Sequence, residues 1–212
     1  MNTGTQSLHL IGGAGTVEAL RDDPVLVGGA TARGVAVIAH PHPLFGGAMT
    51  NKVVQTLARA FVQCGWSAVR FNFRGVGASA GRHDNGLGEA DDMRAVVDQV
   101  APAGVPLALA GFSFGAFVAV QTVVTLWPER PMDKIVLVGT AASRFAVPPL
   151  PSEARERTIV VHGEVDDTVP LAAVLDWARP QTLPVTVVPG VEHFFHGQLT
   201  LLKHLVVRHL IA

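Results

Sequence analysis

Residues 105–126 of this 212-residue chain read VPLALAGFSFGAFVAVQTVVTL. The apolar run from Val105 to Ala110 has the length of one buried strand and is too short for an ordinary helix. The pattern G-x-S-x-G follows, with Ser113 at its centre, and a second apolar stretch then has the length of a helix. A serine on a sharp turn between a strand and a helix is typical of a nucleophile elbow. The sequence therefore predicts that Ser113 is a nucleophile exposed at the end of a buried strand.

An ordinary glycine-rich turn is the alternative interpretation of this stretch. The chain contains 22 Gly, so two glycines and a serine can fall at this spacing by chance. In an elbow, however, the neighbouring chain passes so close that the positions two before and two after the serine must lack bulk. Gly111 and Gly115 meet that demand, and the apolar strand and helix on either side favour the elbow.

Composition indicates one globular domain over residues 1–212. Hydrophobic residues make up 49% of the chain and charged residues 16%, which predicts a large buried core. The net charge is −1, without long charge runs, so nucleic acid and anionic membranes are poor partners. Residues 1–9 lack the features of a signal peptide, no apolar segment reaches the roughly 20 residues of a membrane span, and Cys64 is the single cysteine. A reducing cytoplasm fits these features.

Strands and helices alternate along the rest of the chain. Short apolar pieces within 8–29, broken by Gly-Gly, Asp-Asp-Pro and Gly-Gly, predict hairpin strands at the edge of a sheet. Further strands are expected at 35–39, 66–73, 135–138, 158–161 and 185–188, and helices at 51–63, 87–100, 171–178 and about 197–210. This alternation predicts the α/β class, with a mostly parallel sheet covered by helices on both faces. A site is then expected in the loops that follow the strands.

Two of these loops carry an acid and a base that Ser113 would need. Asp166 and Asp167 follow the strand at 158–161, and His193 follows the strand at 185–188. The chain order of serine, acid and histidine is the order found in α/β-hydrolases. His193 would take the proton of the serine hydroxyl, and the acid would orient the imidazole and stabilise its cation.

Four motifs in this order carry a resemblance to a known family. They are His40-Pro41-His42-Pro43 with Gly46-Gly47, Gly111 to Gly115, His162-Gly163-Glu164-Val165-Asp166, and Gly190-Val191-Glu192-His193-Phe194-Phe195. With them the chain resembles small α/β-hydrolases of the serine hydrolase type that lack a lid, and is distantly similar to dienelactone hydrolases. The resemblance implies the α/β-hydrolase fold without a cap domain. Dienelactone hydrolases use a cysteine nucleophile where this chain has Ser113, so their specific activity is not implied.

The resemblance also implies which acid and which histidine are catalytic. The pattern His-Gly-x-x-Asp favours Asp166, and Asp167 is then a solvated turn or cap residue. The family places the base directly before the paired phenylalanines, which selects His193 over His196. His196 is expected to begin the last helix as a capping or surface residue.

The oxyanion hole needs two N–H groups that point at the developing negative charge. One is expected from Phe114, the residue after the nucleophile. The other should come from loop 40–47, where the two prolines have no N–H to donate. His42 and Leu44 remain, and the turn that this loop resembles favours His42 while Leu44 stays open.

No cofactor or metal is expected. His40 and His42 would share a face of an extended segment and could begin a metal site, but nothing in their loop adds a third ligand. The chain also lacks a phosphate-binding G-x-x-x-x-G-K-[ST] loop. Among the other polar residues, His162 is expected to pack beneath the acid loop, Arg74 to support a turn through a salt bridge, and His83 and Asp84 to lie at the rim of the site.

The loops suggest an open site for small substrates. The interval 139–157 contains three prolines and is expected to be a loop rather than a helical lid. Candidates for apolar pocket walls are Phe45, Phe114, Phe145 and Phe195. The favoured hypothesis is a serine esterase that cleaves short-chain carboxylic esters or thioesters through an acyl-enzyme.

Two other functions stay open at this point. One is a peptidase or amidase that uses the same triad, and the other is a binding protein without catalysis on the hydrolase fold. Apolar residues on the last helix would serve either a homodimer or the core.

Overall fold

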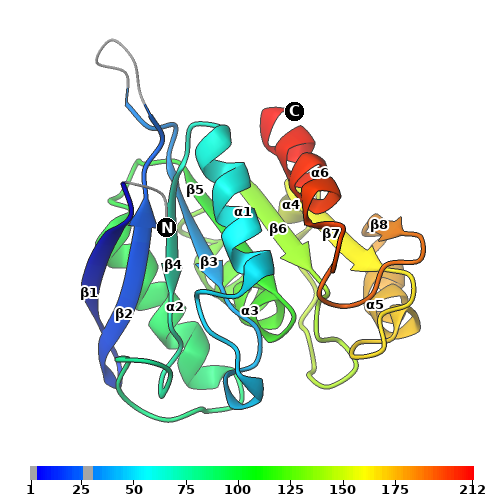
Figure 1. The fold of residues 1–212 in the computed structure, drawn as a ribbon, viewed down its shortest axis with the longest axis horizontal. Helices are drawn as coiled ribbons and strands as arrows, with labels where there is room; N and C mark the ends of the chain where they lie inside the picture. Colours follow the sequence, from blue (N-terminus) through cyan, green and yellow to red (C-terminus); the bar gives the residue numbers. More distant parts are fainter. Residues whose placement is uncertain (1–3, 26–30) are drawn as a thin grey trace.

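A computed structural model of the chain describes residues 4–25 and 31–212. Its centre is an eight-stranded sheet with the strand order β1-β2-β4-β3-β5-β6-β7-β8 (Figure 1). The strands are β1 (Gln6–Gly12), β2 (Gly15–Asp22), β3 (Val35–Ala39), β4 (Ser67–Phe71), β5 (Leu107–Phe112), β6 (Lys134–Val138), β7 (Thr158–Gly163) and β8 (Val185–Val188). Strands β3 to β8 pair in parallel, which confirms the prediction of a mostly parallel sheet.

The N-terminal strands form the predicted hairpin at one edge of this sheet. Strands β1 and β2 pair antiparallel, with Gly12 opposite Gly15 at the turn, and β2 joins the sheet antiparallel to β4. The second Gly-Gly of the predicted hairpin region, at 28–29, lies outside the described residues.

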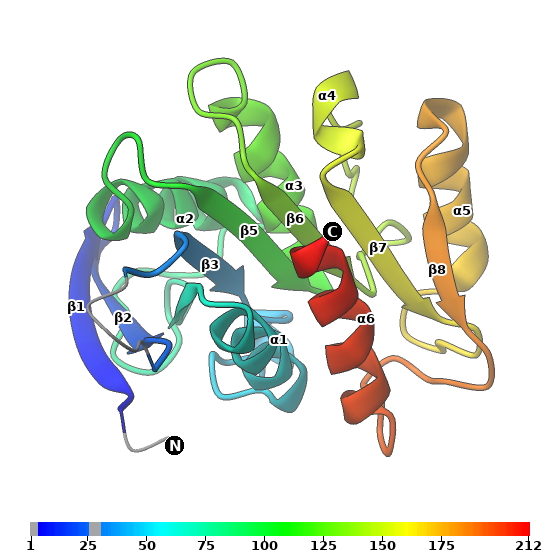
Figure 2. The ribbon, with the colours of Figure 1, turned by 90° about the horizontal axis from the view of Figure 1, so that it is seen from above.

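Helices cover both faces of the sheet, as Figure 2 shows from above. Helices α1 (Lys52–Gln63) and α6 (Leu199–Ile211) lie on one face, and α2 (Leu87–Val100), α3 (Phe114–Leu126) and α5 (Leu171–Ala178) on the other. Asn51 caps α1, because its side chain accepts the N–H of Val53 at 2.9 Å.

The core consists of two apolar layers that the sheet separates. Successive side chains of a strand point to opposite faces. In β3, Ala36 and Ile38 therefore pack into the layer below α1 and α6, whereas Val35, Val37 and Ala39 pack into the layer below α2 and α3. A strand that is buried on both faces must be apolar along its whole length, and β3 is.

The interval after β6, for which the prolines predict a loop, contains one turn of helix, α4 (Ser152–Arg155). This turn leads into the first residue of β7, so it lies at the edge of the sheet opposite the carboxyl ends of the strands (Figure 2). It forms no lid over those ends, and the fold is that of an α/β-hydrolase without a cap.

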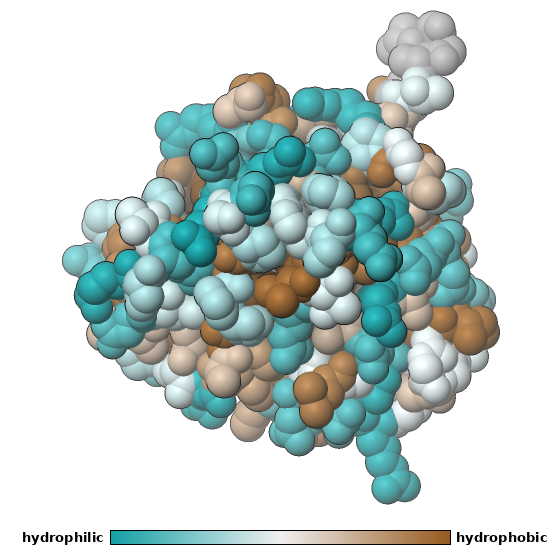
Figure 3. Space-filling model, turned by 180° about the vertical axis from the view of Figure 1, so that it is seen from behind, coloured by the Kyte–Doolittle hydropathy of each residue, from teal (hydrophilic) through white to brown (hydrophobic). Residues whose placement is uncertain are grey.

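The surface carries scattered apolar residues. On the face with α2, α3 and α5, hydrophobic residues form separate patches among hydrophilic ones (Figure 3). On the other face, Leu201 and Ile211 of α6 are exposed, and a dimer through this helix stays a prediction. Within the described residues, no helix is both long and apolar enough to cross a membrane.

Candidate active site

Ser113 lies at a sharp turn between β5 and α3. Its backbone has φ 58° and ψ −117°, a conformation that is strained for a residue with a side chain. The Ser113 N–H donates to the carbonyl of Val138 at 2.8 Å, which fixes the turn on β6. A Cβ at Gly111 would collide with the backbone of Gly115, and a Cβ at Gly115 would collide with the carbonyls of Ala39 and His40. The two glycines are therefore required by close packing of the backbone, as the elbow interpretation predicts.

His193 bridges the serine and an acid. Its Nε2 lies 3.0 Å from Ser113 Oγ, and its Nδ1 lies 2.6 Å from Asp166 Oδ2. A carboxylate oxygen accepts hydrogen bonds, so Nδ1 carries the proton and Nε2 is left to accept the serine hydroxyl. All three residues are buried, with 7% of Ser113, 6% of Asp166 and 1% of His193 exposed. The geometry is that of a serine hydroxyl facing a general base.

Asp166 rather than Asp167 contacts the histidine. The Oδ1 of Asp166 accepts the N–H groups of Thr168 at 3.0 Å and Val169 at 2.7 Å. Burial by itself would raise the pKa of Asp166, but the hydrogen bonds from His193 and Val169 hold that pKa below its usual value. Asp167 is exposed and its carboxylate accepts the Thr168 hydroxyl at 3.2 Å, which fits the expected turn residue.

Two glutamates shape the loop that carries His193. The Glu192 carboxylate accepts the N–H groups of Phe194 at 2.8 Å and His196 at 2.7 Å. The Glu164 carboxylate accepts the N–H of Gly190 at 2.9 Å, which ties this loop to the acid loop. The backbone on both sides of His193 is thus held by carboxylates.

The prediction that His196 begins the last helix is wrong. Helix α6 starts at Leu199, and Gln198 is its N-cap residue. The His196 side chain is 72% exposed and lies 3.1 Å from the Glu192 carboxylate. The N–H groups of Phe194 and His196 donate to the Glu192 carboxylate, so this segment forms a turn and the helix begins further along the chain than the apolar pattern suggests.

His162 packs beneath the acid loop, as expected. It is fully buried, and its Nε2–H donates to the carbonyl of Val169 at 2.9 Å. Burial lowers the pKa of His162. A neutral imidazole at this position supports the Val169 segment, whose N–H in turn binds Asp166.

The candidate oxyanion donors lie at the start of α3 and in loop 40–47. Phe114 is the first residue of α3, so its N–H has no acceptor within the helix and lies at the positive end of the helix dipole. In loop 40–47, the Leu44 N–H donates to His42 Nδ1 at 3.3 Å, and the Leu44 side chain is 70% exposed. The His42 N–H has no acceptor among the described residues. Of the two alternatives, the free donor is therefore that of His42.

His40 has a structural environment. Its Nδ1–H donates to the carbonyl of Pro41 at 2.6 Å, and its Nε2 accepts the N–H of Phe73 at 2.9 Å. Burial lowers the pKa of His40 to about 4. Both ring nitrogens bind the chain itself, so His40 has none to share with His42 in a metal site. In the described part of the chain, no three His, Cys, Asp or Glu residues form a group that could hold a metal ion.

A cavity of about 330 Å³ opens beside Ser113 and His193. Its aromatic walls include the predicted residues Phe45, Phe114 and Phe145. Asn51, Ala141, Arg144, Thr168 and Val169 also line it, and Arg144 is the one Lys, Arg, Asp or Glu in the lining. The cavity is thus mostly apolar, with one cation and no acid.

The assignment of Phe195 to the pocket is wrong. Phe195 is 1% exposed and packs in the core layer below α6, whereas its neighbour Phe194 lines the cavity and is 40% exposed. Phe195 has φ 55°, so the backbone turns sharply here and sends the paired rings in different directions. The paired phenylalanines were visible in the sequence, but no periodic pattern shows which of them faces the site.

Comparison with known proteins places the chain in a family. A family model described as serine aminopeptidase, S33, matches residues 30–163, more than half of the chain. The crystal structure of XC6422 from Xanthomonas campestris, described as an α/β serine hydrolase without lid, is 35% identical with a TM-score of 0.85. The similarity covers 100% of this chain and 95% of that one.

Two further proteins are similar to this chain. An α/β serine hydrolase homologue from Coxiella burnetii is 34% identical, with a TM-score of 0.82 and 98% of each chain covered. A protein of Rickettsia prowazekii, RP471, is 45% identical over 93 residues, which span 42% of this chain and only 39% of that protein. The similarity to dienelactone hydrolases stays a prediction. From the family model and the full-length structural relatives, we conclude that the chain belongs to the α/β serine hydrolases, as a small member without a lid.

Proposed function

We propose that this protein hydrolyses small carboxylic esters or thioesters through a Ser113-His193-Asp166 triad and an acyl-enzyme. The observation that carries the proposal is the buried line of hydrogen bonds from Ser113 Oγ through His193 to Asp166, at 3.0 and 2.6 Å. A serine hydroxyl is a weak nucleophile at neutral pH, and a base at this distance activates it.

In the first half of the reaction, Ser113 Oγ attacks the substrate carbonyl carbon while His193 Nε2 takes the hydroxyl proton. The negative charge on the tetrahedral oxygen is bound by the N–H groups of Phe114 and His42. The intermediate collapses, the bond to the alcohol or thiol breaks, and His193 returns the proton to that leaving group. Ser113 is left acylated, and Asp166 stabilises the imidazolium throughout.

In the second half, water replaces the leaving group. His193 takes a proton from water, the resulting oxygen attacks the acyl carbon, and the carboxylic acid leaves as the proton passes to Ser113 Oγ. No cofactor is needed for this sequence. The cavity beside Ser113 is open to water, because the fold has no lid over it.

The size and walls of the cavity favour small acyl groups. A volume of about 330 Å³ is at the lower end of the range for small-molecule sites. Phe45, Phe114, Phe145 and Phe194 give it apolar walls that suit a short acyl chain or a small aromatic group.

Amide cleavage on the same triad is the second candidate, and the description of the matched family model as a serine aminopeptidase favours it. Amides need an amine leaving group to be protonated by the histidine, whereas an aryl oxide or thiolate can leave more readily. A panel with matched acyl groups therefore separates the two activities.

The test is steady-state hydrolysis of 4-nitrophenyl esters from two to twelve carbons, one acyl thioester, and the 4-nitroanilide of the best acyl group, with Ser113→Ala as the blank. We expect kcat/KM to be highest for esters of two to six carbons and a transient acyl mass on the wild-type protein only. A preference for the anilide would select the amidase alternative, and a maximum at ten or twelve carbons would contradict the short pocket.

A further inference from the structure

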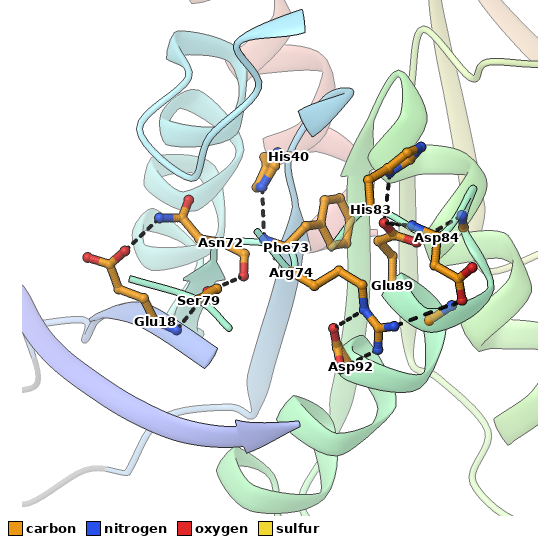
Figure 4. Close-up of polar contacts among 12 residues, drawn as sticks. Glu18, His40, Asn72, Phe73, Arg74, Ser79, His83, Asp84, Glu89 and Asp92 are labelled. Carbon is orange, nitrogen blue, oxygen red and sulfur yellow. Dashed lines mark hydrogen bonds and ion pairs between the residues drawn. The ribbon is translucent and has the colours of Figure 1, made fainter. Parts of the chain in front are cut away.

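His83 lies in the loop that joins β4 to α2, and a buried carboxylate holds its ring (Figure 4). Glu89, in the first turn of α2, is 0% exposed. One of its oxygens binds His83 Nδ1 at 2.8 Å and the N–H of Asp84 at 2.9 Å, and the other accepts the N–H of Gly86 at 2.9 Å. Because the carboxylate accepts these bonds, His83 Nδ1 carries a proton. Glu89 therefore fixes the orientation of the His83 ring, and His83 itself is not among the residues that line the cavity beside Ser113.

The same ring contacts both residues that carry the candidate oxyanion donors. The centroid of His83 is 4.7 Å from that of His42, with 45° between the ring planes, and 5.4 Å from that of Phe114. The rings of His42 and Phe114 are themselves 4.9 Å apart. The aromatic rings of the two residues that carry the candidate N–H donors, His42 and Phe114, thus pack against each other and against His83.

The outer part of loop 40–47 is largely exposed to solvent. His40 anchors its start through the bond to the Phe73 N–H (Figure 4). Beyond that point the side chains of Leu44 and Phe45 are 70% and 76% exposed. The ring of His42 joins this outer part of the loop to His83 and Phe114, and it also lies 6.0 Å from the ring of Phe145.

We propose that His83 and Glu89 are a positioning pair for the oxyanion hole: Glu89 fixes the His83 ring, and that ring sets the distance between the N–H groups of His42 and Phe114. The proposal rests on the proposed function, because it assumes that these groups bind the tetrahedral oxygen. Donors in an oxyanion hole act only when they are held at hydrogen-bond distance from the oxygen of the transition state. Neither His83 nor Glu89 touches the substrate in this role.

The loop that joins β4 to α2, which carries His83, also offers a matched control. Arg74 binds Asp92 through two hydrogen bonds, of 2.7 and 2.9 Å, and thereby supports the turn as expected (Figure 4). Asp92 is 1% exposed, so it is a buried carboxylate on α2 like Glu89. Its partner Arg74 makes no ring contact with His42 or Phe114. Loss of Asp92 therefore weakens the loop without removing the ring behind the oxyanion donors.

The experiment compares His83→Gln, Glu89→Gln and Asp92→Asn with the wild type. In His83→Gln the new amide can still donate to Glu89, so we expect this variant to fold. It therefore tests the proposal even if Glu89→Gln does not fold. The measurements are kcat and KM for the best ester, the affinity of a trifluoromethyl ketone that forms a tetrahedral oxyanion on the serine, the melting temperature, and amide hydrogen exchange over residues 40–47.

For His83→Gln we expect kcat to fall about 10- to 100-fold, as for a small displacement of catalytic groups. KM should change by less than about twofold, because the contact acts in the transition state. Ketone affinity should fall by the same factor as kcat, and exchange over 40–47 should rise. Asp92→Asn should lower the melting temperature while kcat and ketone affinity stay within about threefold of the wild type.

Two results would overturn the proposal: a folded His83→Gln protein with wild-type kcat and ketone affinity, or equal losses in Asp92→Asn. A wild-type protein that neither hydrolyses the esters nor binds the ketone would instead overturn the proposed function. Hydrogen exchange then still decides whether His83 positions the loop, since unchanged exchange over 40–47 in His83→Gln would contradict it.

Discussion

The ring of His193 reaches Ser113 across the end of β6, at the position of Gly139. Nε2 of His193 lies 3.0 Å from Ser113 Oγ although 80 positions separate the two residues. A Cβ at Gly139 would lie 3.1 Å from the His193 ring, and Gly139 has φ 55°. The absence of a side chain here leaves the path open between the loop after β8 and the elbow after β5.

Gly139→Ala should therefore damage the triad. The added Cβ would lie closer to the His193 ring than ordinary packing allows, so the ring would have to shift by a few tenths of an ångström. We expect kcat to fall, by less than the roughly 100-fold that a misplacement of about 1 Å can cause. Gly104→Ala is the control, because Gly104 has φ 84° with nothing within 4 Å of its added Cβ. Both variants carry similar backbone strain, so equal kcat values in the two would show that Gly139 does not make room for His193.

Asp166→Asn and Asp167→Asn should differ by orders of magnitude. The Asn amide cannot hold the His193 tautomer as a carboxylate does, so kcat of Asp166→Asn should fall by about 10⁴. Asp167 is exposed, and its carboxylate accepts a hydrogen bond from the Thr168 hydroxyl rather than from His193. We therefore expect kcat of Asp167→Asn to stay within about threefold of the wild type. Steady-state kinetics with one ester is the measurement, and a larger loss in Asp167→Asn would reverse the assignment of the acid.

The two adjacent phenylalanines should respond differently to truncation. Phe195→Ala removes a buried core side chain and should lower the free energy of unfolding by about 3–5 kcal/mol. Phe194→Ala removes a cavity wall that is partly exposed, so it should alter the preference for acyl length with a smaller loss of stability. Urea unfolding and the ester series measure both effects. A shift in acyl preference in Phe195→Ala, with none in Phe194→Ala, would contradict the structure of this turn.

The stability of the protein should fall in mild acid because of His40. The pKa of His40 is about 4 in the folded chain and about 6.5 when unfolded, so the unfolded state binds the extra proton between these values. The full stability is present above about pH 6.5, and it is lost as the pH falls toward 4. A shift of this size corresponds to about 3 kcal/mol of unfolding free energy.

His209, whose pKa is also lowered to about 4, by burial and by the nearby Lys134, acts in the same direction. NMR titration of the imidazole signals separates the two histidines. A titration midpoint for His40 at or above pH 6 would contradict the buried, neutral ring, since its Nε2 could not then accept the N–H of Phe73.

The sequence was sufficient to predict the fold, and the three residues that it proposes as a triad lie within hydrogen-bond distance of one another in the structure. Each of Ser113, Asp166 and His193 follows an apolar strand, and the carboxyl ends of parallel strands meet at one edge of a sheet. Strand length and apolar pattern are local properties of the sequence. They therefore predict that these residues lie at strand ends without any knowledge of tertiary contacts.

The errors and omissions concern side-chain directions and contacts between loops. The sequence pattern misplaces Phe195 and His196, because the φ of 55° at Phe195 and the bonds to Glu192 determine the path of this turn. The space left at Gly139 and the contact of His83 with His42 depend on residues far apart in the sequence. No periodicity reports such contacts, since they arise when separate loops pack together.

The most direct test of the proposed triad is labelling with a fluorophosphonate, followed by intact mass and peptide mapping, with Ser113→Ala alongside. This probe phosphonylates a serine whose hydroxyl is activated by a base and whose oxyanion is bound. We predict a single adduct on Ser113 in the wild-type protein and no adduct in the variant. An unlabelled wild-type protein, under conditions that label a known esterase, or an adduct on another residue, would contradict the assignment of Ser113 as the nucleophile.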